Sequence, residues 1–322
     1  MRCALMVLAL LPHVCWGAWH SDEQPIMGTR VHVALWSEDA ELAGALLERA
    51  MAEMHRVDAA FSTHKSTSEL SRLNRDAPLG WVTVSDELFE LLSRARRVSE
   101  WSDGAFDVTY ASVGRYYDFR AGKVPDAAEL EAVKAIDYRL VEQHADSQRV
   151  RYGHPRTYVD LGGIAKGHAV DRVAQMLIDA GVAHGSVTAG GDSRIIGDRN
   201  GKPWHIGVQD PRKTGAMVAI LPLVDTAVST SGDYERFFEA DGVRYHHIID
   251  PDTGDSARGA LGVTVLGDDA TLTDALSTTI FVLGLEAGLE FANGIPGIDA
   301  IIIDPEGGMH FTEGLADLSG SG

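Results

Sequence analysis

The segment 158–167 restricts the fold of this chain more than any other part of the sequence, because it joins a short strand to a helix through two adjacent glycines. It reads Tyr158-Val-Asp160-Leu-Gly162-Gly163-Ile-Ala-Lys166-Gly167. From Gly167 onward, apolar residues recur at helical spacing until Gly181, and a glycine at that position favours the end of a helix. We therefore expect a strand, a glycine turn and a helix over 167–181 in direct succession.

Two interpretations suit this glycine turn. Glycines let a ligand approach the backbone closely, the start of a helix offers unpaired N–H groups, and Lys166 adds a positive charge. These properties favour a site for an anion such as a phosphate. The segment matches neither a Walker A loop nor the GxGxxG pattern, so a tight structural turn explains it equally well.

The rest of the chain alternates between strand and helix patterns without an obvious linker. The alternation of Val31, Val33 and Leu35 predicts a half-buried strand, and Ser85 is a good N-cap for a helix. Predicted strands cover residues 29–36, 185–188, 204–208, 217–221, 262–266 and 300–303, and predicted helices cover 41–57, the segment after Ser85, 167–181 and 273–283. We expect one mixed α+β domain over residues 18–318 and a disordered tail at 319–322.

The N-terminus has the pattern of a secretory signal peptide. Arg2 precedes an uninterrupted apolar run over 4–11, and small residues suited to a signal peptidase follow Pro12. We predict cleavage after Gly17 and export, in a bacterium to the periplasm. A buried N-terminal helix and a lipid anchor on Cys15 are alternatives that the pattern favours less, because the residue before Cys15 is not small. No later apolar run reaches the roughly 20 residues of a transmembrane helix, so we expect none in the mature chain.

Charge and cysteine content exclude several classes of function. Lys and Arg number 28 against 47 Asp and Glu, which gives a net charge of −19 and argues against binding to nucleic acid. The two cysteines, Cys3 and Cys15, both precede the predicted cleavage site. The mature chain therefore has no thiol for a disulfide, a zinc ribbon or a cysteine nucleophile.

Three further segments carry polar side chains in patterns typical of sites. Gly190-Gly191-Asp192 follows a predicted strand, although such a glycine pair is more often only a turn. His246-His247 leads into an Asp-Pro turn, which places an imidazole near a loop where acid–base chemistry is common. A surface or core histidine is an equally good explanation.

The third segment places three oxygens on one helical face, from Asp274, Ser277 and Thr278. One carboxylate and two hydroxyls suit a hard cation such as Mg²⁺, which retains waters and accepts ligands from a substrate phosphate. Taken alone, the segment fits better an N-cap aspartate with hydroxyls bonded back to the helix.

Eight motifs in a fixed order resemble those of the FAD:protein FMN transferases, the ApbE family. They run from Met27 to about residue 293. In chain order they are Met27-Gly-Thr29, Phe61-Ser-Thr-His64 with Ser68-Glu-Leu-Ser-Arg-Leu-Asn74, Gly104-Ala-Phe106-Asp107-Val-Thr109, Asp160-Leu-Gly-Gly-Ile-Ala-Lys-Gly167, Gly190-Gly-Asp192, Val228-Ser-Thr-Ser-Gly-Asp233, His246-His-Ile-Ile-Asp-Pro251 and Asp274-Ala-Leu-Ser-Thr278. The ordered series is far more specific than any one motif.

The resemblance implies a magnesium-dependent transferase with FAD as its substrate. Such an enzyme attaches FMN through a phosphoester bond to a Thr or Ser of an acceptor protein and releases AMP. His247 and Asp274 are the implied catalytic residues. The implied metal ligands are Gly163, Asp274, Ser277 and Thr278. The implied FAD contacts are Met27, His64, Ala105, Phe106, Asp107, Asp160, Lys166, Gly190, Gly191, Asp192 and Ile248.

His64 departs from the family pattern, in which an aromatic Tyr or Trp commonly stacks on the flavin. An imidazole stacks over a smaller area, so ring placement is the property that this change puts in question. An FAD pyrophosphatase and a flavin-binding protein without catalysis are the alternative functions. The implied acceptor is an exported or membrane redox subunit with a flavinylation Thr or Ser.

Overall fold

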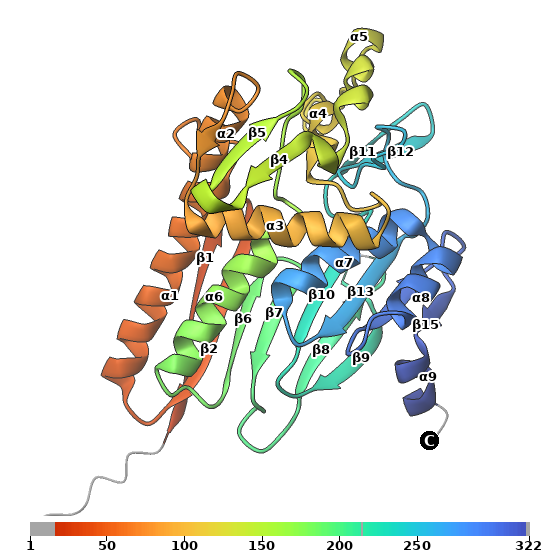
Figure 1. Cartoon of the computed structure of the whole chain (residues 1–322). Coiled ribbons are helices and arrows are strands. Elements are labelled where there is room, and N and C mark those ends of the chain that lie inside the picture. The colour runs from red at the N-terminus through yellow and green to blue at the C-terminus, as the bar shows by residue number, and fades with distance from the viewer. Residues whose placement is uncertain (1–16, 214, 320–322) are drawn as a thin grey trace, which may run out of the picture.

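An eight-stranded antiparallel sheet forms the centre of the molecule (Figure 1). The computed structural model describes residues 17–213 and 215–319. The strand order is β1-β2-β6-β7-β10-β13-β14-β15, and each neighbouring pair is antiparallel. The strands are β1 Ala18–Ile26, β2 Thr29–Ser37, β6 Gly185–Ala189, β7 Asp192–Ile196, β10 Ala227–Gly232, β13 Gly262–Gly267, β14 Asp299–Ile303 and β15 Met309–Phe311.

Helices cover one face of this sheet. The three long ones that lie on it are α1 Ala40–Phe61, α6 Ala165–Asp179 and α7 Ala270–Leu283, while α3 Asp86–Trp101 crosses their ends (Figure 1). N-cap side chains explain where two of these helices begin. Asp39 and Ser85 accept hydrogen bonds from backbone N–H groups in the first turns of α1 and α3. Gly181 has a φ of 87° directly after α6, a conformation that glycine adopts without strain.

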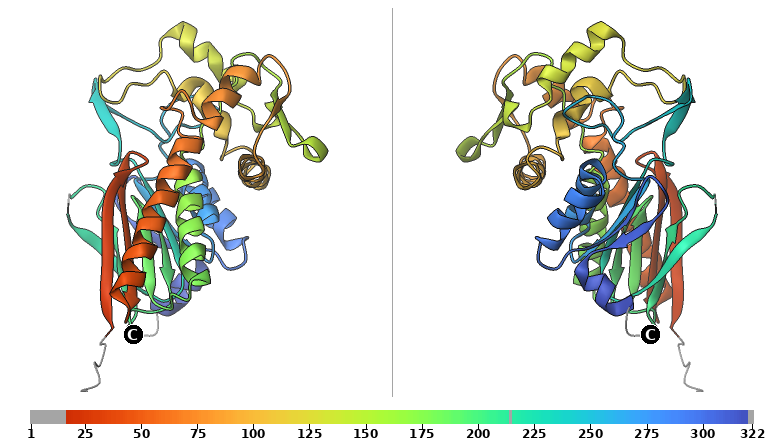
Figure 2. Two further views of the ribbon diagram at one scale, coloured as in Figure 1. Left: turned by 90° about the vertical axis from the view of Figure 1, so that its left-hand side faces the viewer. Right: turned by 90° about the vertical axis from the view of Figure 1, so that its right-hand side faces the viewer.

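The opposite face of the sheet is covered by a hairpin. Its strands are β8 Trp204–Gln209 and β9 Met217–Leu223, and Figure 2 shows them on the far side of the sheet from the helices. Ile302 of β14 is buried in the main core, whereas its neighbours Ile301 and Ile303 pack against Val208 of β8. Successive side chains of a strand point to opposite faces of the sheet, so β14 contributes to a separate hydrophobic core on each face.

The remaining elements form a cap beyond one end of the sheet (Figures 1 and 2). They are α2 Glu69–Asp76, α4 Ala111–Gly114, α5 Ala127–Leu130, the small sheet β3 Val82–Thr83, β5 Arg149–Tyr152 and β4 Val141–His144, and the hairpin β11 Phe237–Ala240 and β12 Val243–His246. Short 3-10 helices connect them, among them η1 Val108–Tyr110. Helices α8 Leu285–Asn293 and α9 Glu313–Ser319 flank the C-terminal strands.

The predicted mixed α+β fold is confirmed, with shifts at several boundaries. The prediction of a strand directly before the glycine turn is wrong: residues 157–161 belong to no strand, because the side chain of Asn74 bonds both the N–H and the carbonyl oxygen of Val159 in place of a neighbouring strand. The helix expected at 167–181 begins at Ala165, and the one expected at 273 begins at Ala270 because Asp269 is its N-cap. The predicted signal peptide falls outside the described residues except for Gly17, as do residues 320–322 of the predicted tail, while Ser319 ends α9. No helix among the described residues is long and apolar enough to cross a bilayer.

Candidate functional site

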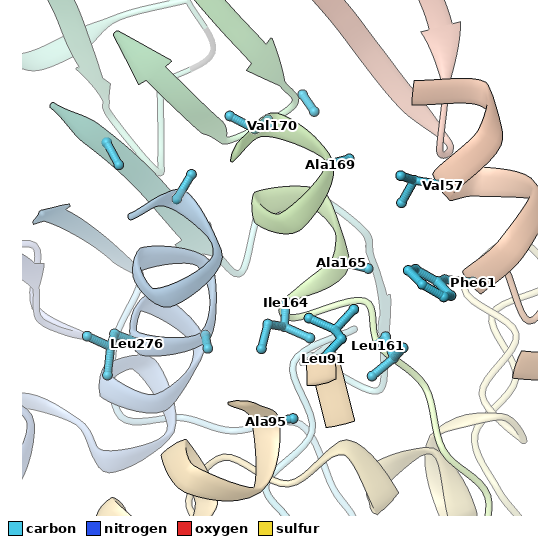
Figure 3. Packing of buried hydrophobic residues seen from close by; sticks show 14 of the residues in the cluster. Val57, Phe61, Leu91, Ala95, Leu161, Ile164, Ala165, Ala169, Val170 and Leu276 are labelled. Carbon is cyan, nitrogen blue, oxygen red and sulfur yellow. The ribbon is translucent and has the colours of Figure 1, made fainter. Parts of the chain in front are cut away.

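Two buried side chains fix the glycine turn in front of α6. Leu161 and Ile164 are each 1% exposed and lie on either side of Gly162 and Gly163. Figure 3 shows both pointing into the core, among residues of α1, α3 and α7 that include Phe61, Leu91, Ala95 and Leu276. The turn is thus anchored by packing, and its glycines face away from the core residues that hold it.

Asp160 ties this turn to two other elements. Its carboxylate accepts hydrogen bonds from Oγ1 of Thr63 at 2.8 Å, from the hydroxyl of Tyr110 at 3.0 Å and from the N–H of Gly162 at 2.7 Å. Burial raises the pKa of Tyr110 well above its usual value, and the charge of Asp160 adds to the effect. Tyr110 is therefore a neutral donor that orients Asp160, and no sequence motif pointed to it.

Lys166 lies between two buried carboxylates. Its ammonium is bound to Asp192, at the start of β7, and is 3.4 Å from Oδ1 of Asp274 on α7. The side chains of Asp192 and Asp274 are only 1% and 4% exposed. Burial raises the pKa of Asp274 to about 7, and the neighbouring Asp192 contributes in the same direction. The expected phosphate-binding lysine is thus already engaged with carboxylates in this structure.

Asp274 is not the N-cap of its helix, so that part of the simpler interpretation is wrong. The hydroxyl of Ser277 does bond back to the helix, donating to the carbonyl oxygen of Asp274 at 2.9 Å. Asp274 lies in the second turn of α7 and accepts a hydrogen bond from the N–H of Gly167 at 2.9 Å. A Cβ atom at Gly167 would lie 2.1 Å from the carbonyl oxygen of Ala270, so only glycine allows α6 to approach α7 this closely. The contact holds the two motifs against each other.

Three hydroxyl groups of β10 and α7 lie close to one another near the Asp274 motif. Ser231 of β10 lies 2.8 Å from the hydroxyl of Ser277 and 3.4 Å from that of Thr278. A Cβ atom at Gly163 would lie 3.2 Å from Oγ1 of Thr278 and 3.3 Å from the Phe106 ring, so these three predicted residues meet. Ser231 belongs to one of the resembling motifs, but sequence reasoning gave it no role.

The donors gathered here fit a hard cation. A carboxylate, hydroxyls and a backbone carbonyl are the oxygen ligands that Mg²⁺ accepts together with water and substrate oxygens. Across the described parts of the chain, no cluster of three or more His, Cys, Asp and Glu side chains could hold a metal. A cation at this place would therefore depend on the neutral oxygens of Gly163, Ser277 and Thr278 in addition to Asp274.

The two adjacent histidines have different environments. His246 is buried, and its Nε2 lies 2.7 Å from the carbonyl oxygen of Ala257, so its hydrogen bond is structural. The Nδ1 atom of His247 is buried and has no hydrogen-bond partner among the described residues. Burial lowers the pKa of His247 to about 3, and the positive charges of Arg236 and Lys166 lower it further. His247 is thus a neutral imidazole with an unused nitrogen in this structure.

The segment 105–107 meets the site through Phe106, whose ring lies beside Gly163. Both carboxylate oxygens of Asp107 are engaged, one by the N–H and hydroxyl of Thr109 and the other by the N–H of Tyr138. Burial raises the pKa of Asp107 to about 6. The side chain of Asp107 therefore holds the loop in its conformation. Ala105, two residues earlier in the chain, is half-buried.

The other residues predicted to contact FAD lie on several separate elements. Met27 occupies the β1–β2 turn with a φ of 55°, and Ile248 is buried in the core. His64 is exposed, three residues after the last residue of α1. Gly190 and Gly191 form the β6–β7 turn, where a Cβ atom at Gly191 would lie 2.5 Å from the carbonyl oxygen of Thr230. This pair therefore has a structural reason to be glycine.

Comparison with known proteins places this fold and site in one family. The model of the ApbE family matches residues 27–302. An FAD:protein FMN transferase of Treponema pallidum is 34% identical over 321 residues, which cover 92% of this chain and 88% of that protein. The ApbE protein of Thermotoga maritima superimposes with a TM-score of 0.85 at 36% identity, over 93% of this chain and 98% of its own. The flavin transferase ApbE of Vibrio cholerae gives a TM-score of 0.82 at 29% identity, over 94% and 99%.

An antiparallel sheet with helices on one face is thus the fold that these solved structures share with this chain, and in this chain it carries the lysine–carboxylate cluster where α6 meets α7. The chain belongs to the ApbE family.

Proposed function

We propose that this protein is an exported, magnesium-dependent FAD:protein FMN transferase. The observation that carries the proposal is the convergence of Gly163, Lys166, Asp192, Asp274 and Thr278 beside a neutral His247. Phosphoryl transfer needs positioning and neutralisation of charge more than covalent help, and this cluster offers hard oxygen donors with a base nearby. The curated relatives and the family assignment support the same reaction.

The proposed reaction moves one phosphoryl group. The hydroxyl oxygen of an acceptor Thr or Ser forms a bond to the phosphorus of the FMN half of FAD. The bond from that phosphorus to the bridging oxygen breaks, and AMP leaves with this oxygen. The proton of the acceptor hydroxyl passes to His247, whose Nδ1 has no other partner in the described structure. The negative charge of the bound diphosphate would raise the low pKa of this imidazole toward the range of a general base.

The residues around Asp274 would hold the metal ion. Gly163 through its carbonyl, Asp274, Ser277 and Thr278 supply oxygen ligands, and a bound Mg²⁺ would neutralise charge on the pyrophosphate. Asp160 and Phe106 line the same turn and are proposed to contact FAD, together with the β1–β2 turn at Met27. The acceptor is proposed to be an exported redox subunit, and the chain is proposed to act in the bacterial periplasm after cleavage behind Gly17.

Mass spectrometry of the acceptor tests the function directly. The mature protein is incubated with FAD, Mg²⁺ and a candidate acceptor, and the acceptor should gain the mass of FMN less one water on one Thr or Ser while AMP appears in equal amount. An acceptor with that residue changed to valine is the matched control. Release of free FMN and AMP without labelling would identify a pyrophosphatase, and FAD bound without products would identify a flavin-binding protein.

Export is tested separately by sequencing the N-terminus of the protein recovered from the periplasmic fraction. A mature chain that begins at Ala18 is expected. An intact N-terminus in the cytoplasmic fraction would contradict the proposed location without affecting the proposed reaction.

A further inference from the structure

The side chain of Arg236 extends toward the β1–β2 turn from a segment that has no assigned role. This residue lies between β10 and β11, and its carbonyl oxygen accepts a hydrogen bond from the N–H of His247 at 3.1 Å. Its side chain is directed to the β1–β2 turn, where Nη2 is 3.4 Å from the carbonyl oxygen of Gly28. The guanidinium therefore lies between the His247 segment and the turn that carries Met27.

The charge of Arg236 is not matched by a carboxylate. The nearby Arg212 forms a two-point ion pair with Asp233, and Arg244 is paired with Asp233 and Glu239. Arg236 forms no ion pair with any acidic side chain of the described residues, and its one contact at Gly28 is long. A guanidinium has five N–H donors, so most of its hydrogen-bonding capacity is unused.

Lys166 cannot supply the missing positive charge by itself. Two carboxylates, Asp192 and Asp274, already surround its ammonium, so this group of three side chains has no excess positive charge. This group together with the proposed Mg²⁺ would neutralise a bound diphosphate only in part, so further cationic partners would favour its binding. In a chain of net charge −19, the surroundings do not provide them without a specific residue.

The positive charge of Arg236 shifts the pKa of groups inside the site. Its charge lowers the pKa of His247, and it opposes the rise in the pKa of Tyr110 that burial causes. The guanidinium of Arg115, in contrast, stacks on the rings of Tyr116 and Tyr158. Arg236 is thus the arginine near His247 whose donors are free for a ligand.

We propose that Arg236 is an anion-binding residue of the site and donates hydrogen bonds to the phosphate oxygens of the FMN half of FAD. A guanidinium presents paired donors that match two oxygens of one phosphate, which positions the phosphorus as well as attracting the anion. This inference rests on the proposed function, because it takes FAD as the ligand. It assigns to Arg236 the part of phosphate recognition that Lys166 cannot fill.

Calorimetric titration without metal tests the role apart from turnover. FAD and riboflavin, which lacks the phosphates, are titrated into the full-length mature protein in the presence of EDTA. Arg236→Gln should weaken binding of FAD by about 10- to 100-fold, the usual worth of hydrogen bonds to a charged group. Riboflavin should bind to this variant and to the wild type equally well, and Arg236→Lys should recover part of the FAD affinity.

Arg199→Gln is the matched control, because it removes the same charge from an arginine that stacks on Trp204 far from the β1–β2 turn. It should leave both affinities unchanged. Normal FAD affinity in Arg236→Gln would refute the proposal, as would equal losses for FAD and riboflavin. An unchanged FAD affinity with a raised KM for the acceptor would assign Arg236 to the acceptor instead. If the wild-type protein bound no FAD even with Mg²⁺ added, the proposed function itself would fail, which is a different result from failure of the variant alone.

Discussion

Replacing Gly167 with alanine should test whether the close contact between α6 and α7 builds the site. The added Cβ would lie 2.1 Å from the carbonyl oxygen of Ala270, 2.7 Å from its carbonyl carbon and 2.8 Å from the Cβ of Asp274. Two of these atoms belong to the backbone of another helix, so no side-chain rotation relieves the clash. The two helices must separate, and the hydrogen bond from Gly167 N–H to Asp274 must lengthen or break.

Three contributions set the size of the effect. Overpacking in a rigid interior costs about 1–3 kcal/mol. Loss of a hydrogen bond to a buried carboxylate costs a further ~1.5–3 kcal/mol. Alanine gains up to ~1 kcal/mol over glycine inside a helix. The free energy of unfolding should therefore fall by about 2–5 kcal/mol.

Urea denaturation followed by circular dichroism measures this change, and the chain offers a matched control. Gly44 is exposed on α1, and a Cβ atom there would meet nothing within 4 Å. Gly44→Ala should stabilise the protein by about 0.5–1 kcal/mol through helix propensity alone. If Gly167→Ala were as stable as Gly44→Ala, the contact between α6 and α7 would not have the strength assigned to it.

Four further outcomes are expected. His247→Ala should slow transfer by about 10²–10⁴-fold while leaving FAD affinity almost unchanged, and equal losses in kinetics and titration would make His247 a binding residue. Asp274→Ala, or removal of Mg²⁺ by EDTA, should abolish transfer measured by AMP release, with Thr278→Val less severe; an active Asp274→Ala would remove the metal assignment. The folded-state pKa of His247 is near 3 and the unfolded value near ~6.5, so its contribution to stability is present above pH ~6.5 and is lost as pH falls toward 3. Urea titrations at pH 7.5 and 5 should therefore show a smaller acid loss for His247→Gln than for wild type. Asp107→Asn turns one acceptor of Thr109 or Tyr138 into a donor and should lower the free energy of unfolding by ~1–3 kcal/mol, which an unchanged urea midpoint would contradict.

Elements with a clear apolar period could be predicted from sequence, and edge or polar strands could not. The helices α1, α3 and α6 and the strand β2 each bury one regular apolar face, while α7 and β14 were recognised by apolar runs that are buried on nearly all sides. Strand β1 was missed because only Ile26 of its nine residues is buried, which leaves no alternation to recognise. Strand β10 was missed because Ser229 and Ser231 occupy positions on the face toward α7, where a hydrophobic pattern would be expected.

Much the same limit applies to the site. Sequence reasoning found the segments that carry Asp160, Lys166, Asp192 and Asp274. Each has glycines or a carboxylate close to the end of a predicted strand or the start of a predicted helix. The contact of Lys166 with both carboxylates arises from the packing of β7, α6 and α7 against one another. No local sequence pattern encodes that packing.

Tyr110, Ser231 and Arg236 were missed for a related reason. Each acts through a partner far away in the sequence, such as Asp160 for Tyr110 and Gly28 for Arg236. His247 was found as a residue, but its low pKa arises from burial and from cations brought near it by folding.

The two outer strands of the large sheet bear on how this protein avoids aggregation. An unpaired strand edge can recruit a strand from another molecule. At one edge, β1 carries Asp22, Glu23 and Pro25, and a proline has no N–H to donate to an added strand. At the other edge, β15 spans only Met309–Phe311, and the chain then turns back so that Thr312 bonds to Ala300. Both edges are poor templates for strand addition, so a broad sheet is protected from edge-to-edge polymerisation on both sides.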